Sequence, residues 1–378
     1  MTANSKSITY FVTEDWYFCS HRLQLAVAAK AAGYTVYVVT HVESHGAEIE
    51  AAGLNLIPVN LSRRSKNLFV ELIFIAKLVR VYRDIEPDIT HNVALKPVLY
   101  GSIAAWLAGV PAVVNAMAGL GFLFTSDRKL ARVLRPVIRG MFKILLNNRR
   151  TVTILQNPDD IDALCSRGTV NRNRIRLIRG SGVDTDVYEA LPEPDGIPVV
   201  LLASRMLWDK GIGQFVEAAG ILKRGGVVAR FVLAGEGDEE NPGSISSDQL
   251  RAWHQEGNVE WWGRCSDMPT IFAEIHVVCL PTAYGEGVPK VLIEAASCGR
   301  PIVATDAPGC REIVIDGQNG MLVPVGDVEA LVVALCELLQ SPDSRKRMGQ
   351  AGRQLVIEEF ALEKVISETL DVYGSITK

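Results

Sequence analysis

The sequence lacks the cysteine spacing of a zinc site or a disulfide framework. Its seven cysteines are scattered over 378 residues, and no two of them form a Cys-x-x-Cys pair. Several lie inside apolar runs, as Cys279 does in Val-Val-Cys-Leu-Pro, where a free thiol behaves as a small apolar side chain. The pattern excludes both kinds of site and predicts a protein of a reducing compartment.

Signal-peptide and membrane-spanning patterns are also missing. The polar residues 1–7 lead directly into a strand-like run at 8–13. The stretch between Lys96 and Asp127 contains no charged residue and is long enough to span a bilayer. It is interrupted, however, by Gly101, a Gly-Val-Pro turn and a glycine-rich loop. We therefore expect a helix, a strand and a loop there. The expected location is the cytoplasm, including a peripheral position on the inner face of the plasma membrane.

Charge is divided unevenly between the two halves of the chain. Residues 1–185 carry 23 Lys and Arg against 14 Asp and Glu, a net charge of +9. Residues 186–378 carry 16 against 29, a net charge of −13. A basic half and an acidic half indicate that each half has its own kind of partner.

The basic excess is concentrated in one helical pattern at 128–143. Its cations recur every three or four residues and therefore lie along one helical face: Arg128, Arg132, Arg135, Arg139 and Lys143. This face is either an ordinary solvated surface or a surface for anionic lipid headgroups or a polyprenyl diphosphate. Nucleic acid is not an expected partner, because no aromatic platform or known binding motif accompanies the charge.

Short β-branched runs alternate with helical patterns throughout, which is typical of parallel sheets built from β-α-β units. The expected strands are 8–13, 35–40, 54–59, 88–93, 112–117, 151–156 and 175–180, then 199–204, 230–237, 258–263, 276–281, 300–305 and 320–325. A linker rich in Pro and acidic residues separates the two series at 189–198.

The expected fold class is α/β, with two doubly wound Rossmann-like domains that face a central cleft. The first domain should comprise residues 1–186 and the second 187–359, with a C-terminal helix at about 360–378 that packs back on the first. In such sheets ligands bind at the carboxyl ends of the strands, so the loops after strands are the places to search for a site.

The most specific segment is Tyr-Gly-Glu-Gly-Val-Pro-Lys-Val-Leu-Ile-Glu, which runs from a strand end through a glycine loop into a helix. Pro289 suits a first helical turn, and the N–H groups of Gly287 and Val288 lie at the positive end of the helix dipole, where phosphate oxygens bind. Glu286 precedes the helix. Glu294 lies more than one turn inside it, where a carboxylate needs a partner such as a sugar hydroxyl. The alternative is a pair of solvated glutamates beside a glycine turn.

This segment resembles the Glu-x7-Glu motif of the retaining glycosyltransferases of family 4, which have the GT-B fold. The similarity extends over nearly the whole chain. Three further elements resemble that family: Arg-x4-Lys-Gly at 205–211, a strand and loop at 233–237, and Gly-x-Gly-Val-Asp at 180–184. Segments of the first half resemble bacterial members that build lipid-linked oligosaccharides and surface polysaccharides.

The resemblance implies a role for each matching residue. Arg205 and Lys210 would neutralise the departing diphosphate in place of a divalent metal. Glu286 would bind the transferred sugar, and Glu294 the ribose hydroxyls. The remaining donor contacts would come from backbone groups of Gly287, Val288 and Pro289 for phosphate and hexose, and of Gly263, Arg264 and Cys265 for the base.

Candidates on the acceptor side come from the first half. His91, Asn92 and Lys96 lie at or after an expected strand end, and the loop with Gly119 and Gly121 leaves room for a ligand to approach. His91 has an alternative as a packed histidine of the protein interior.

The expected activity is transfer of a hexose or N-acetylhexosamine, with retention, from a nucleotide-diphosphate sugar (UDP by the resemblance) to a lipid-linked or polysaccharide acceptor. The alternatives are a UDP-sugar epimerase or hydrolase, and a non-catalytic scaffold. No cofactor or metal is expected. Asp184 and Asp186 form an Asp-x-Asp pattern, which binds a divalent metal in another transferase fold. Here Asp184 belongs to the Gly-Val-Asp turn and Asp186 to the start of the linker, and a metal site generally needs further oxygen ligands.

Overall fold

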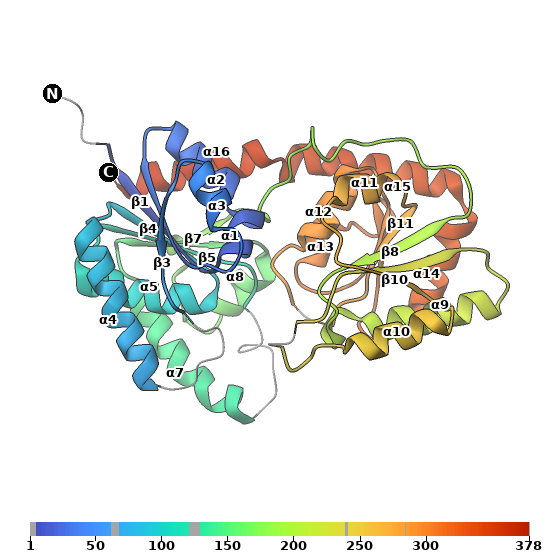
Figure 1. Ribbon diagram of the computed structural model, residues 1–378, viewed down its shortest axis with the longest axis horizontal. Helices are drawn as coiled ribbons and strands as arrows, with labels where there is room; N and C mark the ends of the chain where they lie inside the picture. The colour runs from blue at the N-terminus through green and yellow to red at the C-terminus, as the bar shows by residue number, and fades with distance from the viewer. Residues whose placement is uncertain (1–4, 62–67, 121–128, 239–240, 284, 378) are drawn as a thin grey trace. The chain divides into compact units, whose positions relative to one another are not determined.

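The computed structural model of the chain describes residues 5–61, 68–120, 129–238, 241–283 and 285–377, with the backbone alone at 68 and 129–134. The described chain divides into two compact units (Figure 1). The first comprises Met1–Ser181 and Val365–Lys378, and the second Gly182–Lys364. The division lies slightly before the expected boundary at 186, because Val183 forms a parallel bridge with Ala361 of the second unit.

The first unit contains a seven-stranded sheet in the order β3-β2-β1-β4-β5-β6-β7, in which every described pair is parallel. The strands are β1 (Ser7–Glu14), β2 (Thr35–His41), β3 (Asn55–Pro58), β4 (Ile89–Val93), β5 (Ala112–Met117), β6 (Thr151–Leu155) and β7 (Ile175–Leu177). The helices are α1 (Asp15–His21), α2 (Leu23–Ala31), α3 (Gly46–Ala51), α4 (Leu68–Ile85), α5 (Leu95–Ala108), α7 (Lys129–Leu145) and α8 (Pro158–Cys165).

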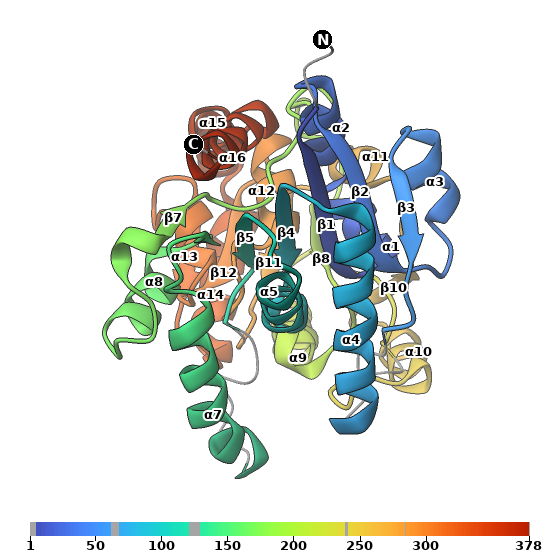
Figure 2. The same ribbon diagram turned by 90° about the vertical axis from the view of Figure 1, so that its left-hand side faces the viewer.

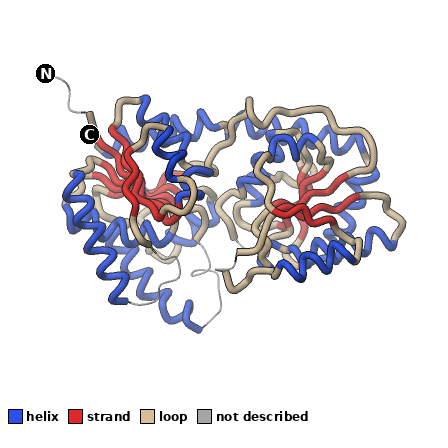
Figure 3. The backbone as a smooth tube through the Cα atoms, viewed as in Figure 1, coloured by secondary structure: helices blue, strands red, loops and turns tan. Residues whose placement is uncertain are grey.

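Helices cover both faces of this sheet, which lies at the centre of the unit (Figure 3). One core cluster joins β1, β2, β4 and β5 to α2 and to the end of the chain, helix α16 (Leu362–Ile376). Tyr373 of α16 is fully buried, and its hydroxyl lies 2.9 Å from that of Tyr10 in β1. A second cluster packs α4 and α5 on the opposite face.

The second unit contains a six-stranded sheet in the order β10-β9-β8-β11-β12-β13, again with every described pair parallel. The strands are β8 (Val199–Ala203), β9 (Arg230–Ala234), β10 (Glu260–Gly263), β11 (Val277–Leu280), β12 (Ile302–Thr305) and β13 (Gly320–Val323). The helices are η2 (Trp208–Lys210), α9 (Ile212–Arg224), α10 (Ser247–Gln255), α11 (Met268–Ala273), α12 (Lys290–Ser297), α13 (Cys310–Ile313), α14 (Val328–Gln340), α15 (Pro342–Leu355) and η3 (Val356–Phe360).

All thirteen strands of the described residues therefore lie where the β-branched runs predict them, and both sheets are of the doubly wound, Rossmann-like kind. The uncharged stretch after Lys96 folds as predicted into helix α5 and strand β5 up to residue 120, and its continuation at 121–128 lies outside the described residues. No helix within the described part of the chain is both long and apolar enough to cross a membrane.

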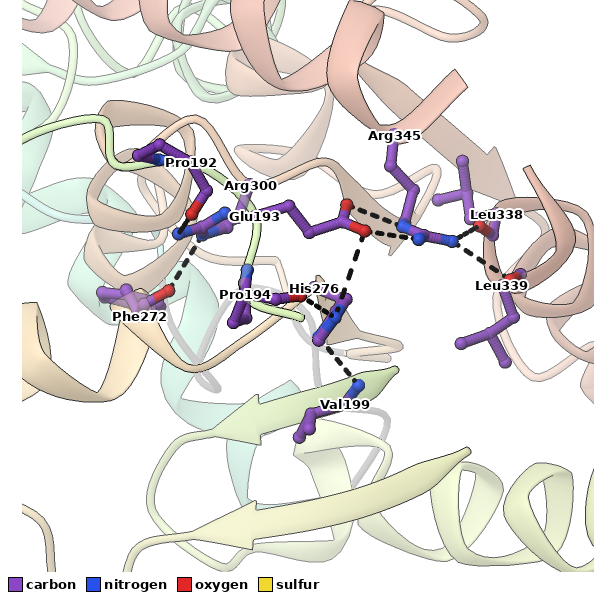
Figure 4. A network of polar contacts seen from close by, with 10 residues as sticks. All are labelled: Pro192, Glu193, Pro194, Val199, Phe272, His276, Arg300, Leu338, Leu339 and Arg345. Carbon is purple, nitrogen blue, oxygen red and sulfur yellow. Dashed lines mark hydrogen bonds and ion pairs between the residues drawn. The ribbon is translucent and has the colours of Figure 1, made fainter. Parts of the chain in front are cut away.

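The linker that precedes β8 is fixed to the second unit by a network of polar contacts (Figure 4). Arg300 donates hydrogen bonds to the carbonyl groups of Pro192 and Phe272 at 3.2 and 2.8 Å. Arg345 donates two hydrogen bonds to the carboxylate of Glu193, one from Nε at 2.8 Å and one from Nη2. Arg300 and Arg345 are each 3% exposed. Two buried guanidinium groups thus hold the linker by its backbone and by one carboxylate.

His276 completes this network in the neutral form. Its Nδ1 accepts the N–H of Val199 at 3.1 Å, and its Nε2 lies 3.0 Å from the carbonyl oxygen of Pro194, which fits an Nε2–H donor. The side chain is 3% exposed, and burial lowers its pKa below the ordinary value of 6.5. Protonation would add a charge in a buried place and remove the acceptor for Val199.

We expect the stability of the second unit to fall in acid because of His276. Below about pH 6.5 the unfolded chain binds a proton at this residue that the folded chain does not, so the free energy of unfolding decreases by up to about 1.4 kcal/mol per pH unit. Urea unfolding of the parent and of His276→Asn at about pH 7 and about pH 5 would measure this. The loss between the two pH values should be smaller in the variant, and an equal loss in both would contradict the assignment.

Candidate active site

Several charged residues of the second half, the predicted Arg205, Lys210 and Glu286 among them, lie at one edge of the second sheet. Because the strands are parallel, the carboxyl ends of β8, β9, β10, β11 and β12 share this edge, where doubly wound sheets bind their ligands. The loops that follow these strands carry Arg205 and Lys210, Asp238, Arg264, Glu286 and Asp306.

Lys210 and Glu286 form an ion pair across two of these loops. The Lys210 Nζ lies 2.6 Å from Glu286 Oε1, and the two side chains are 14% and 18% exposed. Hydrogen bonds fix the distance between the loops, because Thr282 and Ala283, after β11, both donate to the carbonyl oxygen of Asp209 at 3.1 and 2.9 Å. The structure thus brings together two predicted site residues that are far apart in the sequence.

Glycine makes this close approach possible. Gly211, which ends η2, has a φ of +77°, and a Cβ atom at this position would overlap the carbonyl group of Pro281. Gly309, after β12, has a φ of +85°, and its Cβ would overlap the carbonyl group of Gly287. Both positions need a residue without a side chain for two reasons, the left-handed backbone and the neighbouring carbonyl.

Arg205 forms a separate ion pair with Asp238, which follows β9. Its Nη1 lies 2.7 Å from Asp238 Oδ2, and the side chains are 41% and 14% exposed. A backbone hydrogen bond of 2.8 Å from Met206 to Glu236 joins the same two loops. Asp238 was not among the site residues predicted from the sequence, although its place after the strand-end segment Ala-Gly-Glu-Gly was a usable signal.

Glu294 is buried on α12, with 6% of its surface exposed, and two side chains bind its Oε1. The hydroxyl of Tyr188 donates to this atom at 2.9 Å, and the ammonium group of Lys290 lies 3.0 Å away. Burial and the neighbouring carboxylate raise the pKa of Tyr188. Lys290 was detectable from its spacing of four residues to Glu294. Tyr188 was not, because it reaches Glu294 only through the tertiary structure.

The other proposed donor contacts also lie at this edge. Gly287, Val288 and Pro289 are buried directly before α12, and Pro289 is the N-cap residue of the helix, whereas the sequence analysis placed it in the first turn. Gly263 ends β10, and its carbonyl oxygen accepts the N–H of Gly235 at 2.6 Å. Arg264 is exposed and Cys265 partly buried, beside the end of β9.

In the first unit, His91 and Asn92 are interior residues. His91 lies in the middle of β4, not at its end as expected, because it pairs with Tyr10 and Val114 on either side. It is 1% exposed, its Nδ1 lies 2.5 Å from the hydroxyl of Tyr373, and burial lowers its pKa well below the ordinary value. Asn92 is fully buried and donates to Asn115 Oδ1 at 2.9 Å. His91 is therefore a packed histidine of the protein interior, which was the alternative to a site residue.

Lys96 and Gly119 are more accessible candidates. Lys96, in the first turn of α5, is 21% exposed, and its ammonium group lies 2.9 Å from Glu71 Oε1 on α4. Gly119 follows β5 with a φ of +92°, and Gly121 lies outside the described residues.

Asp184 of the Asp-x-Asp pattern has a structural role. Its Oδ1 accepts the N–H groups of Asp186 and Val187 at 3.0 and 3.1 Å, which closes a turn at the start of the second unit. Across the described residues, no group of three or more His, Cys, Asp or Glu side chains is arranged to hold a metal ion.

Comparison with known proteins gives the class of this chain. Residues 7–157 match the family model of glycosyl transferase 4-like domains, and residues 197–341 match that of glycosyl transferases group 1. Together with two Rossmann-like units, these matches define a glycosyltransferase of the GT-B fold. The chain belongs to the family of group 1, or family 4-like, glycosyltransferases.

Relatives and solved structures match along most of the chain. The N,N'-diacetylbacillosaminyl-diphospho-undecaprenol alpha-1,3-N-acetylgalactosaminyltransferase of Campylobacter jejuni is 27% identical over 371 residues, which covers 94% of this chain and 95% of the relative. The UDP-Gal:alpha-D-GlcNAc-diphosphoundecaprenol alpha-1,3-galactosyltransferase of Escherichia coli is 23% identical, with 82% and 81% covered. HepE of Anabaena, solved in complex with UDP-glucose, has a TM-score of 0.77 at 18% identity, with 97% and 99% covered.

Substitution of Gly211 should separate the two loops that carry Lys210 and Glu286. We expect Gly211→Ala to lower the free energy of unfolding by about 3 kcal/mol or more, because left-handed strain and the overlap with Pro281 add. Gly326→Ala is the matched control, since Gly326 has a similar φ of +80° with nothing within 4 Å of its Cβ position. That variant should lose only about 1 kcal/mol. Equal losses in urea unfolding would argue against a steric role for Pro281.

Proposed function

We propose that this glycosyltransferase moves a hexose or N-acetylhexosamine, with retention of configuration, from a nucleotide-diphosphate sugar to a lipid-linked or polysaccharide acceptor. UDP is the proposed nucleotide, in keeping with the names of the Escherichia coli relative and of the HepE complex. The Campylobacter relative is named for an undecaprenol-linked acceptor, which supports a lipid-linked substrate.

The observation that carries the proposal is the meeting of cations and carboxylates from separate strand-end loops at one edge of the second sheet. Lys210 pairs with Glu286 and Arg205 with Asp238 across separate loops, and Lys290 pairs with Glu294 within helix α12. A surface that evolved only for stability has little use for three such pairs, because partly exposed ion pairs contribute about 0–1 kcal/mol each. A bound diphosphate would exchange these carboxylates for phosphate oxygens as partners of Lys210 and Arg205.

The proposed chemistry follows from these positions. The acceptor hydroxyl attacks the anomeric carbon on the face from which the diphosphate departs, and a phosphate oxygen of the leaving group takes the proton. Lys210 and Arg205 stabilise the negative charge that develops on that group, so the proposal requires no metal. Glu286 hydrogen-bonds the transferred sugar and orients its anomeric carbon. Glu294 binds the ribose hydroxyls.

The proposal includes peripheral contact with an anionic membrane, where a lipid-linked acceptor is found. The basic pattern at 128–143 falls on α7, from Lys129 onward, and its described cations differ in exposure. Lys143 is exposed, whereas Arg135 and Arg139 are only partly exposed, and burial lowers the pKa of Arg139. The side chain of Arg132 lies outside the described residues, as does Arg128.

Loss of the Glu286 carboxylate should abolish transfer without loss of the fold. We expect Glu286→Ala to reduce kcat by about 100-fold or more, because the contact orients the reacting sugar. The donor would be the nucleotide sugar that most raises the melting temperature of the parent protein in a panel, and transfer of its labelled sugar would be measured. Glu217→Ala, an exposed carboxylate on α9, is the control. Near-normal turnover of Glu286→Ala would disprove its assigned role.

Tyr188 should influence ribose recognition through Glu294. The affinity for UDP and for its 2′,3′-dideoxy analogue, measured by calorimetry, isolates contacts to the ribose hydroxyls. Glu294→Gln should reduce the preference for UDP strongly, and Tyr188→Phe should reduce it about five-fold, because one hydrogen bond that orients Glu294 is lost. An unchanged preference in Glu294→Gln would refute its ribose role. An unchanged preference in Tyr188→Phe alone would limit Tyr188 to a packing role.

A further inference from the structure

Helix α4 of the first unit has the reverse of the usual polarity in its first two turns. Val70, Leu72 and Ile73 are 49%, 54% and 58% exposed, and Phe69 beside them is 78% exposed. Glu71, in the middle of this run, is only 7% exposed. A surface helix of a globular protein normally turns its apolar side chains inward and its charges outward. Within the described residues, no other run of five carries four exposed large apolar side chains.

The inward-facing charge of this turn is neutralised inside the unit. Glu71 Oε1 lies 2.9 Å from the ammonium group of Lys96, which itself lies 5.4 Å from the centre of the Tyr100 ring. The same side of α4 continues with Phe74, Leu78 and Tyr82, which pack against α5. The register of α4 is therefore fixed by its inner face, and Val70, Leu72 and Ile73 cannot turn inward without the loss of this packing.

The exposed face changes from apolar to basic along the helix. Lys77 lies four residues after Ile73 and Arg80 seven residues after it, so both occupy the face of Ile73. Both are exposed, Arg80 by 85% of its side chain, and Arg80 Nε lies 4.0 Å from Asp84 Oδ2 one turn further along the helix. At 1.5 Å per residue the cations follow Ile73 by about 6 and 10 Å along the axis. With the first turns of α4 directed into the bilayer, this axial spacing places the apolar side chains below the headgroups and the cations at their level.

The apolar turn lies next to the ligand-binding edge of the first sheet. Lys96 follows the carboxyl end of β4, and its ion pair with Glu71 ties that loop to the first turns of α4. Figure 2 shows α4 along one side of α5, with α7 on the other side. An apolar surface that enters a bilayer at this place would hold the loop after β4 close to the headgroups, where the diphosphate of a lipid-linked acceptor lies.

We propose that Val70, Leu72 and Ile73 at the start of α4 insert into the surface of an anionic bilayer, with Lys77 and Arg80 at its headgroups. This proposal rests on the proposed function for the use of a membrane-bound acceptor, but vesicle binding tests it without any transfer reaction. The charge of this surface indicates an anionic bilayer as the partner, because an apolar turn followed by cations complements anionic lipid. The first half of the chain also has a net charge of +9.

Vesicle binding of the full chain tests the proposal. Co-sedimentation with phosphatidylcholine vesicles that contain phosphatidylglycerol would be compared for the parent, for Leu72→Gln/Ile73→Gln and for Val228→Gln/Val333→Gln. The control pair lies in the second unit and is 70% and 66% exposed. We expect the α4 variant to bind at least about ten-fold more weakly, because two apolar side chains no longer enter the bilayer, and the control to bind like the parent. Glutamine is a good helix former, so the helix should persist.

Depth of insertion provides a second measurement. A tryptophan at Ile73→Trp should be quenched by brominated lipids beyond the level of the parent, whereas one at Val333→Trp should not. Parent-like binding of the α4 variant, or equal quenching of the two tryptophans, would overturn the proposal. So would a dimer of the parent that the α4 variant abolishes, since the face would then belong to a second copy.

Failure of this proposal and failure of the proposed function have different signatures. UDP binding by the α4 variant should equal that of the parent, because both residues lie far in the chain from the donor-binding edge. If UDP stabilises neither protein, the proposed donor is wrong, and the vesicle result still stands. If UDP binds both equally and vesicle binding is unchanged, only the insertion of α4 is wrong.

Discussion

The arrangement of the second unit's edge depends on the contact between the end of η2 and the loop after β11. Gly211 leaves no space between its backbone and the carbonyl group of Pro281, and Asp209 accepts two hydrogen bonds from that same loop. This contact sets the separation from which Lys210 and Glu286 form their ion pair at 2.6 Å. A side chain at residue 211 would move the ammonium group relative to the carboxylate, although neither residue had changed.

The charges at this edge are paired with one another. Each cation proposed to bind the donor has a carboxylate partner within hydrogen-bonding distance, and Glu294 is held by both a hydroxyl and an ammonium group. The pairs keep long side chains extended toward the edge, which reduces the entropy that a ligand must remove on binding. Under the proposed function, a diphosphate would compete with carboxylates for cations that are already in place.

The first unit contains polar side chains that are buried and apolar side chains that are exposed, each for a different structural reason. His91 and Asn92 are polar but interior. The contact of His91 with Tyr373 connects the sheet to helix α16, and the hydrogen bond of Asn92 to Asn115 connects strands β4 and β5. The start of α4 is apolar but exposed, because Glu71 occupies the inner position and binds Lys96. Residue type alone assigns both sets to the wrong environment, since the interior position follows from helix register and strand pairing.

The sequence by itself determined the elements and their order. Alternation of β-branched runs and helical patterns located the thirteen strands that the structure describes, because strand formation in a buried parallel sheet depends on local apolar composition. The resemblance to the family 4 glycosyltransferases selected Arg205, Lys210, Glu286 and Glu294 as a set, because the motifs that carry them are local in the sequence.

Only the tertiary structure decided which of these side chains meet. Tyr188 binds Glu294, more than a hundred residues away in the sequence, and Asp238 binds Arg205 from the loop after the next strand. The linker is held on the second unit by hydrogen bonds from Arg300 and Arg345. The outward face of α4 likewise follows from its packing against α5 and not from its composition. Such contacts depend on which strands are neighbours and on how closely their loops pack, and no local pattern of residues encodes those distances.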